Sequence, residues 1–318
     1  MNPVVFIVGC QRSGTTLLHR LMNANPHLAV VHESRWVPGL FEQRIGLTPE
    51  GDVTRDLISL LLDNPRFVTM DLERADLEGL LANGKPVSYS NFMTGVYDLY
   101  GKKHGKNLVG DKTPSYVRSI PTLHHLWPEA KFVHIIRDGR DVCLSATNWK
   151  SGGELRRRFV PLHDEPVTTT AVWWDWLVRS GREAGETLPP DLYREVRYES
   201  LVSNPAEECE ALCEFLGIPY DDAMVRFHEG KERPKPGRSA KNAWLRVTPG
   251  LRDWTTDMAA GDIERFESAA GELIDELGYE RAAPNPGSET LATSASVREA
   301  FARELLSGGD RPPNYWRI

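Results

Sequence analysis

The segment from Val4 to Asn23 constrains the fold more than any other part of the chain. The apolar run Val4–Val8 is followed by a glycine-containing turn and then by a helix pattern over Thr15–Asn23, which Asn25-Pro26 ends. A short, continuously apolar run of this kind is typical of a strand that is buried on both faces of a parallel sheet. The sequence therefore predicts a strand–turn–helix unit of a parallel α/β fold.

Similar units recur along the chain. Further strand patterns lie at 28–31, 107–109, 131–136 and 193–197, and helix patterns alternate with them. Strands that alternate with helices form a parallel sheet with helices on both faces, so we expect an α/β three-layer sandwich with a central, mostly parallel sheet. Such sheets bind ligands beyond the carboxyl ends of their strands, and we expect the chemistry there.

The length of 318 residues fits one large domain, which we assign to residues 1–280. Within it, residues 40–105 form a mostly helical insertion, and 151–170 and 230–255 are predicted loops. The composition shifts to Ala, Pro, Ser and Thr after Tyr279. Residues 281–318 are therefore predicted to be a partly irregular tail with one short helix near Val297–Leu306.

Composition excludes several classes of partner. The net charge of −7 argues against nucleic acid as a partner. No apolar stretch approaches the roughly 20 residues that span a bilayer, and Val4–Val8 is too short for a signal-peptide core, so we expect a cytoplasmic protein without an integral membrane segment. Four cysteines are too few for a disulfide framework. Cys209 and Cys213 lack a companion Cys/His pair, so we expect core thiols and no metal site.

The turn Gly9–Thr16 has the composition of a phosphate-binding loop. Its glycines allow main-chain N–H groups to face an anion, and the following helix adds the positive end of its dipole. Nucleotide triphosphatases carry a lysine where this chain has Thr15, so ATP or GTP hydrolysis is disfavoured. Arg12 indicates a different anion. The alternative is a glycine-rich turn without a ligand.

The segment Gln11–Leu18 resembles the 5′-phosphosulfate loop of sulfotransferases that use 3′-phosphoadenosine-5′-phosphosulfate (PAPS). His32–Pro38 is similar to the corresponding segment of the tyrosylprotein sulfotransferase branch, and the resemblance runs with gaps from Val4 to Tyr279. It implies a P-loop fold, PAPS as co-substrate, no metal, and direct in-line transfer of a sulfuryl group to an acceptor hydroxyl or amine. It also implies that the 5′-phosphosulfate is held by Arg12, Ser13, Gly14, Thr15 and Thr16, with Arg12 catalytic as well.

Glu33 follows the second strand and is the predicted catalytic base. An acceptor hydroxyl must lose a proton as it attacks sulfur, and a positioned carboxylate can take that proton. The tyrosylprotein enzymes carry a glutamate base at the matching place. His32 is the competing base, but strand alternation predicts that the two side chains point to opposite faces. A structural Glu33, paired with Arg35 or Arg12, is the other alternative.

Lys112 follows the third strand and resembles the family's lysine near the bridging oxygen of the donor. A cation fixed there stabilises the charge that develops as the sulfur–oxygen bond breaks, which makes Lys112 the third predicted catalytic residue. Asp111 beside it is expected to hold it in place. A lysine in a solvated loop is the alternative.

The segment from Lys131 to Arg140 places a guanidinium at a strand end. Arg137 and Ser145 match the spacing of the family's 3′-phosphate motif, and an arginine fork grips phosphate well. The alternative is a surface ion pair, Arg137–Asp141 or Arg140–Asp138. His134, inside the strand, is predicted to be a core residue.

Two further nucleotide contacts follow from the resemblance. Tyr198 fits the family's pattern after the fifth strand, either facing adenine or lying in the core. Arg252, near Trp254, is the favoured residue of the late basic loop for closing over the 3′-phosphate. Trp173 and Trp176 share a helix face and are predicted to be core.

Two other functions are compatible with the same motifs: a P-loop small-molecule kinase and a non-catalytic protein that binds phosphoadenosine phosphate. The fold and donor site do not fix the acceptor, which could be a small molecule, a glycan, a lipid or a peptide. The sequence does not determine the oligomeric state.

Overall fold

The computed structural model describes residues 4–147, 164–229, 246–248 and 253–307. Five strands form one sheet in the order β2-β3-β1-β4-β5, and every neighbouring pair is parallel. The strands are β1 (Val5–Gly9), β2 (Leu28–His32), β3 (Leu108–Lys112), β4 (Lys131–Ile136) and β5 (Tyr193–Arg197). All five were predicted from the sequence, and the α/β fold class is confirmed.

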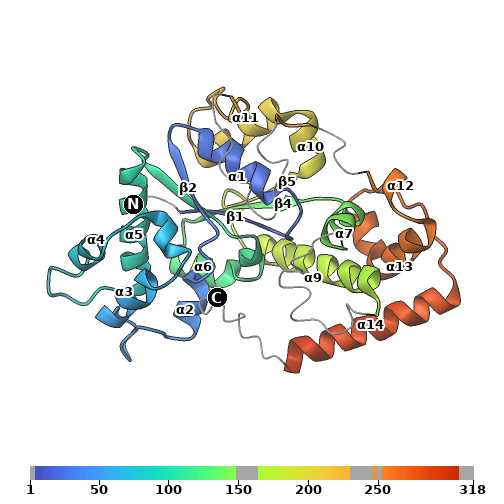
Figure 1. Ribbon diagram of the computed structural model, residues 1–318, viewed down its shortest axis with the longest axis horizontal. Helices are drawn as coiled ribbons and strands as arrows, with labels where there is room; N and C mark the ends of the chain where they lie inside the picture. The colour runs from blue at the N-terminus through green and yellow to red at the C-terminus, as the bar shows by residue number, and fades with distance from the viewer. Residues whose placement is uncertain (1–3, 148–163, 230–245, 249–252, 308–318) are drawn as a thin grey trace.

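Both faces of the sheet are covered, because the side chains of β1 alternate between two cores. Phe6 and Val8 join a large core with α9 (Pro166–Glu186), whereas Val5 and Ile7 join a smaller one with α1 (Thr15–Ala24) and α11 (Pro205–Leu216). Figure 1 shows α1, α10 (Tyr198–Ser203) and α11 on one side of the sheet and α9 on the other. This arrangement is the three-layer sandwich that the alternation of elements predicts.

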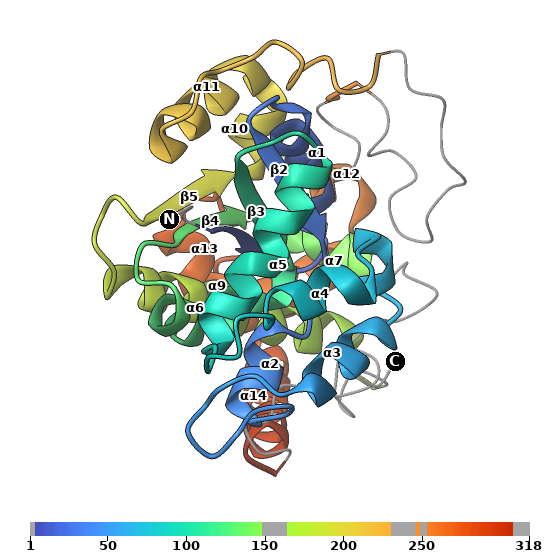
Figure 2. The ribbon, with the colours of Figure 1, turned by 90° about the vertical axis from the view of Figure 1, so that its left-hand side faces the viewer.

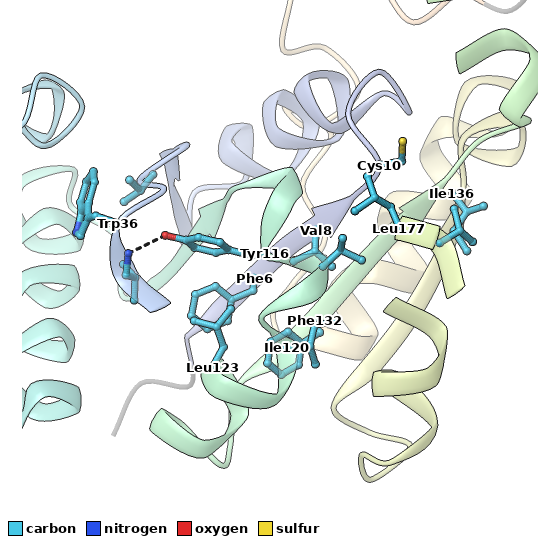
Figure 3. Close-up of a cluster of buried hydrophobic side chains, with 14 of the residues drawn as sticks. Phe6, Val8, Cys10, Trp36, Tyr116, Ile120, Leu123, Phe132, Ile136 and Leu177 are labelled. Carbon is cyan, nitrogen blue, oxygen red and sulfur yellow. Dashed lines mark hydrogen bonds between the residues drawn. The ribbon is translucent and has the colours of Figure 1, made fainter. Parts of the chain in front are cut away.

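The large core is rich in aromatic contacts. The ring of Phe6 stacks on Phe132 with 5.6 Å between centroids, and Tyr116 meets Phe6 edge-on at 6.3 Å. Figure 3 shows Tyr116 beside Phe6, on the side towards Trp36. Trp36 is buried as well, so the chain that follows β2 is anchored directly in this core.

The insertion at residues 40–105 is mostly helical, as predicted. It contains α3 (Arg55–Leu62), the 3-10 helix η1 (Phe67–Met70), α4 (Arg74–Gly79) and α5 (Tyr89–Lys103), preceded by α2 (Val37–Glu42). Figure 2 brings these helices to the front. Their buried residues, such as Leu57, Phe67 and Tyr97, belong to the same core as Phe6. The insertion is therefore continuous with the large core.

The other helices of the described residues are η2 (Pro114–Arg118), α6 (Ile120–Leu126), α7 (Gly139–Thr147), α12 (Trp254–Asp257), α13 (Ala260–Glu276) and α14 (Ser288–Ser307). The helix predicted near Val297–Leu306 is present but begins at Ser288. It packs against α9 and α13, where Phe301 meets the ring of Trp176 at 5.6 Å. We attribute the earlier start of α14 to this packing, because apolar residues are sparse in the helix itself.

Several predicted core residues are buried as expected. The rings of Trp173 and His134 are buried, and His134 Nδ1 lies 2.7 Å from the Tyr193 hydroxyl. Cys209 and Cys213 are buried free thiols. The predicted loops at 151–170 and 230–255 fall largely outside the described residues, and at their described ends the prediction is wrong, because α9 begins at Pro166 and α12 at Trp254. Among the helices in the described ranges, none is long and apolar enough to cross a bilayer.

Candidate active site

The polar segments singled out in the sequence meet along one edge of the sheet. Lys112, at the end of β3, is in register with Ile7 of β1 and with His32 of β2. On the other side of β1, Gly9 is in register with Ile135 of β4. The segments that follow β1, β2, β3 and β4 therefore emerge side by side, at the edge where parallel sheets bind ligands.

The loop after β1 requires glycine at two positions. Gly9 has φ 149°, and a Cβ there would lie 2.5 Å from the main-chain oxygen of Ile135. Gly14 has φ 92°, and a Cβ there would lie 2.3 Å from Cδ2 of Tyr198. Arg12 also adopts a left-handed conformation, with φ 78°. The loop thus curls tightly between β1 and α1, in close contact with β4 and α10.

The start of α1 has features that suit an anion. Gly14 is its N-cap, and no side chain caps the helix. The preceding Ser13 is fully buried, and its hydroxyl has no hydrogen-bond partner. Thr15 is buried and Thr16 partly exposed in the first turn. Main-chain N–H groups at a helix start and a buried hydroxyl without a partner are a combination that an oxyanion would satisfy.

Lys112 and Glu33 form an ion pair at this edge. The side chain of Lys112 is fully buried, and its Nζ donates to Oε1 of Glu33 at 2.9 Å. The same Nζ lies 3.2 Å from Nε2 of His32. The two residues thus meet at the edge where the chemistry was expected, although no ion pair between them was predicted, and the alternative of a solvated Lys112 is wrong.

His32 and Glu33 both face Lys112, so the expectation that they point to opposite faces is wrong. The strand ends at His32, and Glu33 takes a left-handed conformation with φ 55°. Its N–H still donates to the main-chain oxygen of Lys112 at 2.8 Å. This single change of backbone conformation, which costs about 1–2 kcal/mol for a residue with a side chain, turns Glu33 back towards the lysine.

Two arginines complete the surroundings of Glu33. Arg35 forms an ion pair with its carboxylate, as one alternative from the sequence proposed, and Nη1 of Arg66 lies 3.5 Å from Oε2. Arg66 was not predicted, since it precedes η1 in the helical insertion and belongs to no motif. Burial alone would raise the pKa of Glu33, but the charges of Lys112 and Arg35 hold it well below its usual range.

His32 is neutral at physiological pH in this environment. Burial and the neighbouring charge of Lys112 lower the pKa of His32 to about 4. Burial also lowers the pKa of Lys112, while Glu33 opposes that shift. A neutral imidazole nitrogen can accept a hydrogen bond from an ammonium group. Lys112 is therefore held between a carboxylate and an imidazole.

Asp111 does not hold Lys112, contrary to expectation. Neighbouring residues of a strand point to opposite faces, and Asp111 points into the large core. There its carboxylate accepts hydrogen bonds from Tyr97 at 2.9 Å, from Thr113 at 2.8 Å and from Ser34. It lies on the other side of β3 from Lys112.

The predicted 5′- and 3′-phosphate motifs touch each other. Nε of Arg12, in the loop after β1, donates to Oγ of Ser145 at 2.7 Å, although the two residues are 133 positions apart. Ser145 lies on α7 and is 2% exposed. The structure therefore joins the phosphate loop to the helix that follows β4.

Arg137 lies beside the phosphate loop and is almost fully buried. Its Nη2 donates to Asp141 at 2.8 Å, and its guanidinium lies 4.2 Å from the ring centroid of Tyr198, the residue that packs on Gly14. Its Nε is buried without a hydrogen-bond partner. The ion pairs Arg137–Asp141 and Arg140–Asp138 both form, but they are buried and not on the surface.

Comparison with known proteins decides the class. A family model described as "Sulfotransferase family" matches residues 3–222. The chain belongs to the sulfotransferase family.

Curated relatives of this sulfotransferase share about a quarter of its residues. The zebrafish (Danio rerio) protein-tyrosine sulfotransferase 1 is 25% identical over 298 residues, covering 89% of this chain and 74% of the relative. The Mycobacterium tuberculosis omega-hydroxy-beta-dihydromenaquinone-9 sulfotransferase Stf3 is 23% identical over 335 residues, covering 90% and 77%. The names of these relatives thus refer to acceptors of different kinds.

A solved structure shares the fold. The sulfotransferase domain of the Synechococcus PCC 7002 olefin synthase superposes with a TM-score of 0.58 and 23% identity, covering 88% of this chain and 95% of that domain. The sulfotransferase has the parallel α/β architecture of that domain, in agreement with the prediction from its sequence.

Two predictions remain for this sulfotransferase: the role of Arg252 and the absence of a metal site. Arg252 lies outside the described residues. Two residues further along the sequence, the N–H of Trp254 donates to Asp141 at 3.0 Å, and the Trp254 ring lies 3.5 Å from the guanidinium of Arg140. Within the described residues, no group of three or more His, Cys, Asp or Glu side chains could hold a metal ion.

Proposed function

We propose that this sulfotransferase moves a sulfuryl group from PAPS to an acceptor hydroxyl or amine, with Glu33 as the base and Lys112 as the catalytic cation. One observation carries the proposal: a fully buried lysine binds a glutamate at the ligand-binding edge of the sheet. A buried charge is retained at such an edge at a considerable desolvation cost, which is typical of functional sites.

The residues around the phosphate loop fit the proposed co-substrate. Ser13 Oγ and Arg137 Nε are buried polar atoms without partners, and a phosphate oxygen would supply an acceptor for each. We assign the 5′-phosphosulfate to Arg12, Ser13, Gly14, Thr15 and Thr16, the 3′-phosphate to Arg137 and Ser145, and the adenine side to Tyr198. Arg252 is proposed as a further contact. When bound, PAPS supplies the sulfuryl group and a phosphate leaving group.

Glu33, Lys112 and Arg12 then have different roles in a single displacement step. Glu33 accepts the acceptor's proton as a new bond forms between the acceptor atom and sulfur. The bond between sulfur and the leaving phosphate oxygen breaks, and Lys112 donates a hydrogen bond to the negative charge that develops there. Arg12 adds a second positive charge. Stabilising the charge of the transition state more than that of the ground state is what accelerates the step.

Glu33 is a better candidate for the base than His32. Glu33 contacts Lys112 with Oε1 only and keeps Oε2 as a second acceptor, whereas His32 directs Nε2 at Lys112. Because Glu33 stays ionised well below neutral pH, it is available as a base at physiological pH. We therefore assign His32 to the support of Lys112.

The acceptor pocket is proposed to lie on the side of Glu33 where the helical insertion contributes Arg66. Residues 40–105 would then form its wall. The names of the relatives include protein-tyrosine and menaquinone sulfotransferases, so a peptide, lipid, glycan or small-molecule hydroxyl is compatible with the class.

Replacing Glu33 with Gln tests the proposal. The variant keeps the shape of the side chain but removes the base, so turnover with labelled PAPS should fall about 10²–10⁴-fold. The affinity for phosphoadenosine phosphate, measured by calorimetry, should stay close to wild type. Glu276→Gln on the surface of α13 is the matched control and should keep full turnover.

The same assay separates the alternatives. Wild-type activity in Glu33→Gln removes Glu33 as the base, and loss only in His32→Gln would transfer that role to His32. Magnesium-dependent turnover of ATP by the wild type would favour the kinase alternative. Nucleotide binding with no turnover over a broad panel of acceptors would favour the non-catalytic alternative.

A further inference from the structure

Two neighbouring residues of β3 bind two neighbouring residues of the segment that follows β2. Lys112 binds Glu33 on the α1 side of the sheet, at 2.9 Å. On the opposite side, Asp111 accepts hydrogen bonds from the hydroxyl and the main-chain N–H of Ser34. Lys112 thus pairs with Glu33 on one face of the sheet, and the adjacent Asp111 pairs with the adjacent Ser34 on the other face.

The backbone of this segment is held in an uncommon conformation. Glu33 has φ 55° and Arg35 has φ 67°, so Ser34 stands between two left-handed residues that are not glycine. Such conformations persist only where the surrounding structure determines them strongly. The contacts of Ser34 are therefore the natural place to look for what holds Glu33.

The hydroxyl of Ser34 is part of a hydrogen-bond chain with a fixed direction. Its single proton goes to Asp111, so the Tyr116 hydroxyl, 2.6 Å away, must donate to Ser34 Oγ. The Tyr116 oxygen in turn accepts the N–H of Val37 at 3.0 Å. Figure 3 shows Tyr116 with its hydroxyl pointing towards this segment. The chain runs from Val37 through Tyr116 and Ser34 to the Asp111 carboxylate.

This chain is inaccessible to solvent. Asp111 is fully buried, and Ser34 and Tyr116 are each 2% exposed. The hydrogen-bonding capacity of the Asp111 carboxylate is used, because Tyr97 and Thr113 also donate to it. A satisfied buried network is rigid, since losing any one bond would leave a buried polar group unpaired.

We propose that Asp111, Ser34 and Tyr116 are positioning residues for sulfuryl transfer. Their hydrogen-bond chain fixes the segment Glu33–Arg35 in the conformation that aims the Glu33 carboxylate at Lys112. The inference rests on the proposed role of Glu33 as the base and adds the residues that place it. None of the three touches Glu33 with its own side chain.

Removing single hydroxyl groups tests this inference. Tyr116→Phe and Ser34→Ala should each lower kcat about 10- to 100-fold, because a small misplacement of a reacting group has effects of that size. The affinity for phosphoadenosine phosphate should stay unchanged. The double variant should lose little more than either single one, since both break the same chain. Ser34→Thr keeps the hydroxyl and should recover turnover relative to Ser34→Ala.

The pH profile gives a readout that lost stability alone would not change. The charged and titratable groups facing Glu33 are Lys112, Arg35, Arg66 and His32. If Glu33 moves away from Lys112, its pKa rises, so the acid limb of kcat/KM should shift to higher pH in Tyr116→Phe. Tyr193→Phe, which removes a hydroxyl bonded to His134, is the control and should keep the wild-type profile.

Wild-type kcat and an unshifted acid limb in both Tyr116→Phe and Ser34→Ala would overturn the inference. If Tyr116→Phe does not fold, the pair Ser34→Ala and Ser34→Thr decides, because equal activity in these two would also overturn it. Glu33→Gln separates the two levels. An active Glu33→Gln defeats the proposed base, whereas an inactive one beside fully active Ser34→Ala defeats only the positioning role.

Discussion

The ammonium group of Lys112 lies 2.9 Å from the Glu33 carboxylate and is completely buried. Arg35 and Arg66 also contact that carboxylate, so one negative charge faces three positive ones. The excess of positive charge leaves capacity to stabilise further negative charge, such as that of a leaving phosphate. The site is therefore suited to anionic transition states before any ligand is considered.

Replacing Lys112 with Met should remove most of the site's ability to stabilise the negative charge of the leaving phosphate. We expect kcat to fall about 10²–10³-fold, the usual effect of removing one fixed donor to a developing charge. Single-turnover measurements with labelled PAPS would show the loss in the chemical step.

Lys106→Met is the matched control for Lys112→Met. Lys106 Nζ also donates to oxygen atoms, those of Asn23 at 2.6 Å and Leu28 at 3.0 Å, but at the other end of β2 and β3. It should lose stability and keep kcat. An equal fall of kcat in both lysine variants would contradict the catalytic role of Lys112.

Arg137→Ala should weaken the binding of nucleotides with a 3′-phosphate selectively. Hydrogen bonds to charged groups contribute about 1.5–3 kcal/mol, so the affinity for phosphoadenosine phosphate should fall about 10- to 100-fold. The affinity for adenosine 5′-phosphate, which lacks the 3′-phosphate, should change little. Calorimetric titration of both nucleotides gives the comparison.

Two variants control for the ion pair that Arg137 makes. Asp141→Asn removes its partner at 2.8 Å but keeps the guanidinium, so the preference for the 3′-phosphate should persist. Arg179→Ala removes a partly exposed arginine of α9 and should leave both affinities intact. An equal loss for the two nucleotides in Arg137→Ala would defeat the assignment.

The strands, the phosphate loop and the positions of Glu33 and Lys112 at strand ends were predictable because each depends on a local pattern, whereas the ion pair between these two residues was not predicted. Apolar runs such as Val4–Val8 predicted buried strands, and parallel strands bring their carboxyl ends to one edge. The motifs at those ends could therefore be placed near one another from the sequence alone, as the contact of Arg12 with Ser145 confirms.

The orientation of individual side chains could not be predicted. Alternation gave the wrong face for Glu33, because the left-handed conformation of a non-glycine residue has no reliable signal in the sequence. Arg66 approaches Glu33 from a helical insertion whose packing only the folded structure determines. The start of α14 at Ser288 depends likewise on contacts with α9 and α13.

Buried neutral histidines should make the fold sensitive to mild acid. Burial lowers the pKa of His134 to about 3, and it lowers the pKa of His19 well below its usual value. The unfolded chain binds protons at these positions below about pH 6.5, whereas the folded chain does not. Between these values, each histidine lowers the free energy of unfolding by up to about 1.4 kcal/mol per pH unit of acidification.

His134→Gln isolates this effect away from the site. Urea unfolding at several pH values below neutrality should show a slope about 1.4 kcal/mol per pH unit smaller than that of the wild type. Glu33 does not interfere, since its lowered pKa contributes stability that is lost only below its unfolded value, about 4.3. Identical slopes in the two proteins would show that His134 does not titrate in this way.

Gly14→Ala should damage the phosphate loop through a contact as well as through backbone strain. An added Cβ would lie 2.3 Å from Cδ2 of Tyr198, and the residue has φ 92°. Gly217 at the end of α11 has φ 71° with nothing within 4 Å of an added Cβ, so Gly217→Ala measures the strain alone, about 1–2 kcal/mol. Gly14→Ala should therefore lower the thermal midpoint further and weaken nucleotide binding. In a Tyr198→Ala background the contact disappears, and the loss of stability caused by Gly14→Ala should shrink to that caused by Gly217→Ala. An excess that survives without the Tyr198 ring would place its cause elsewhere in the loop.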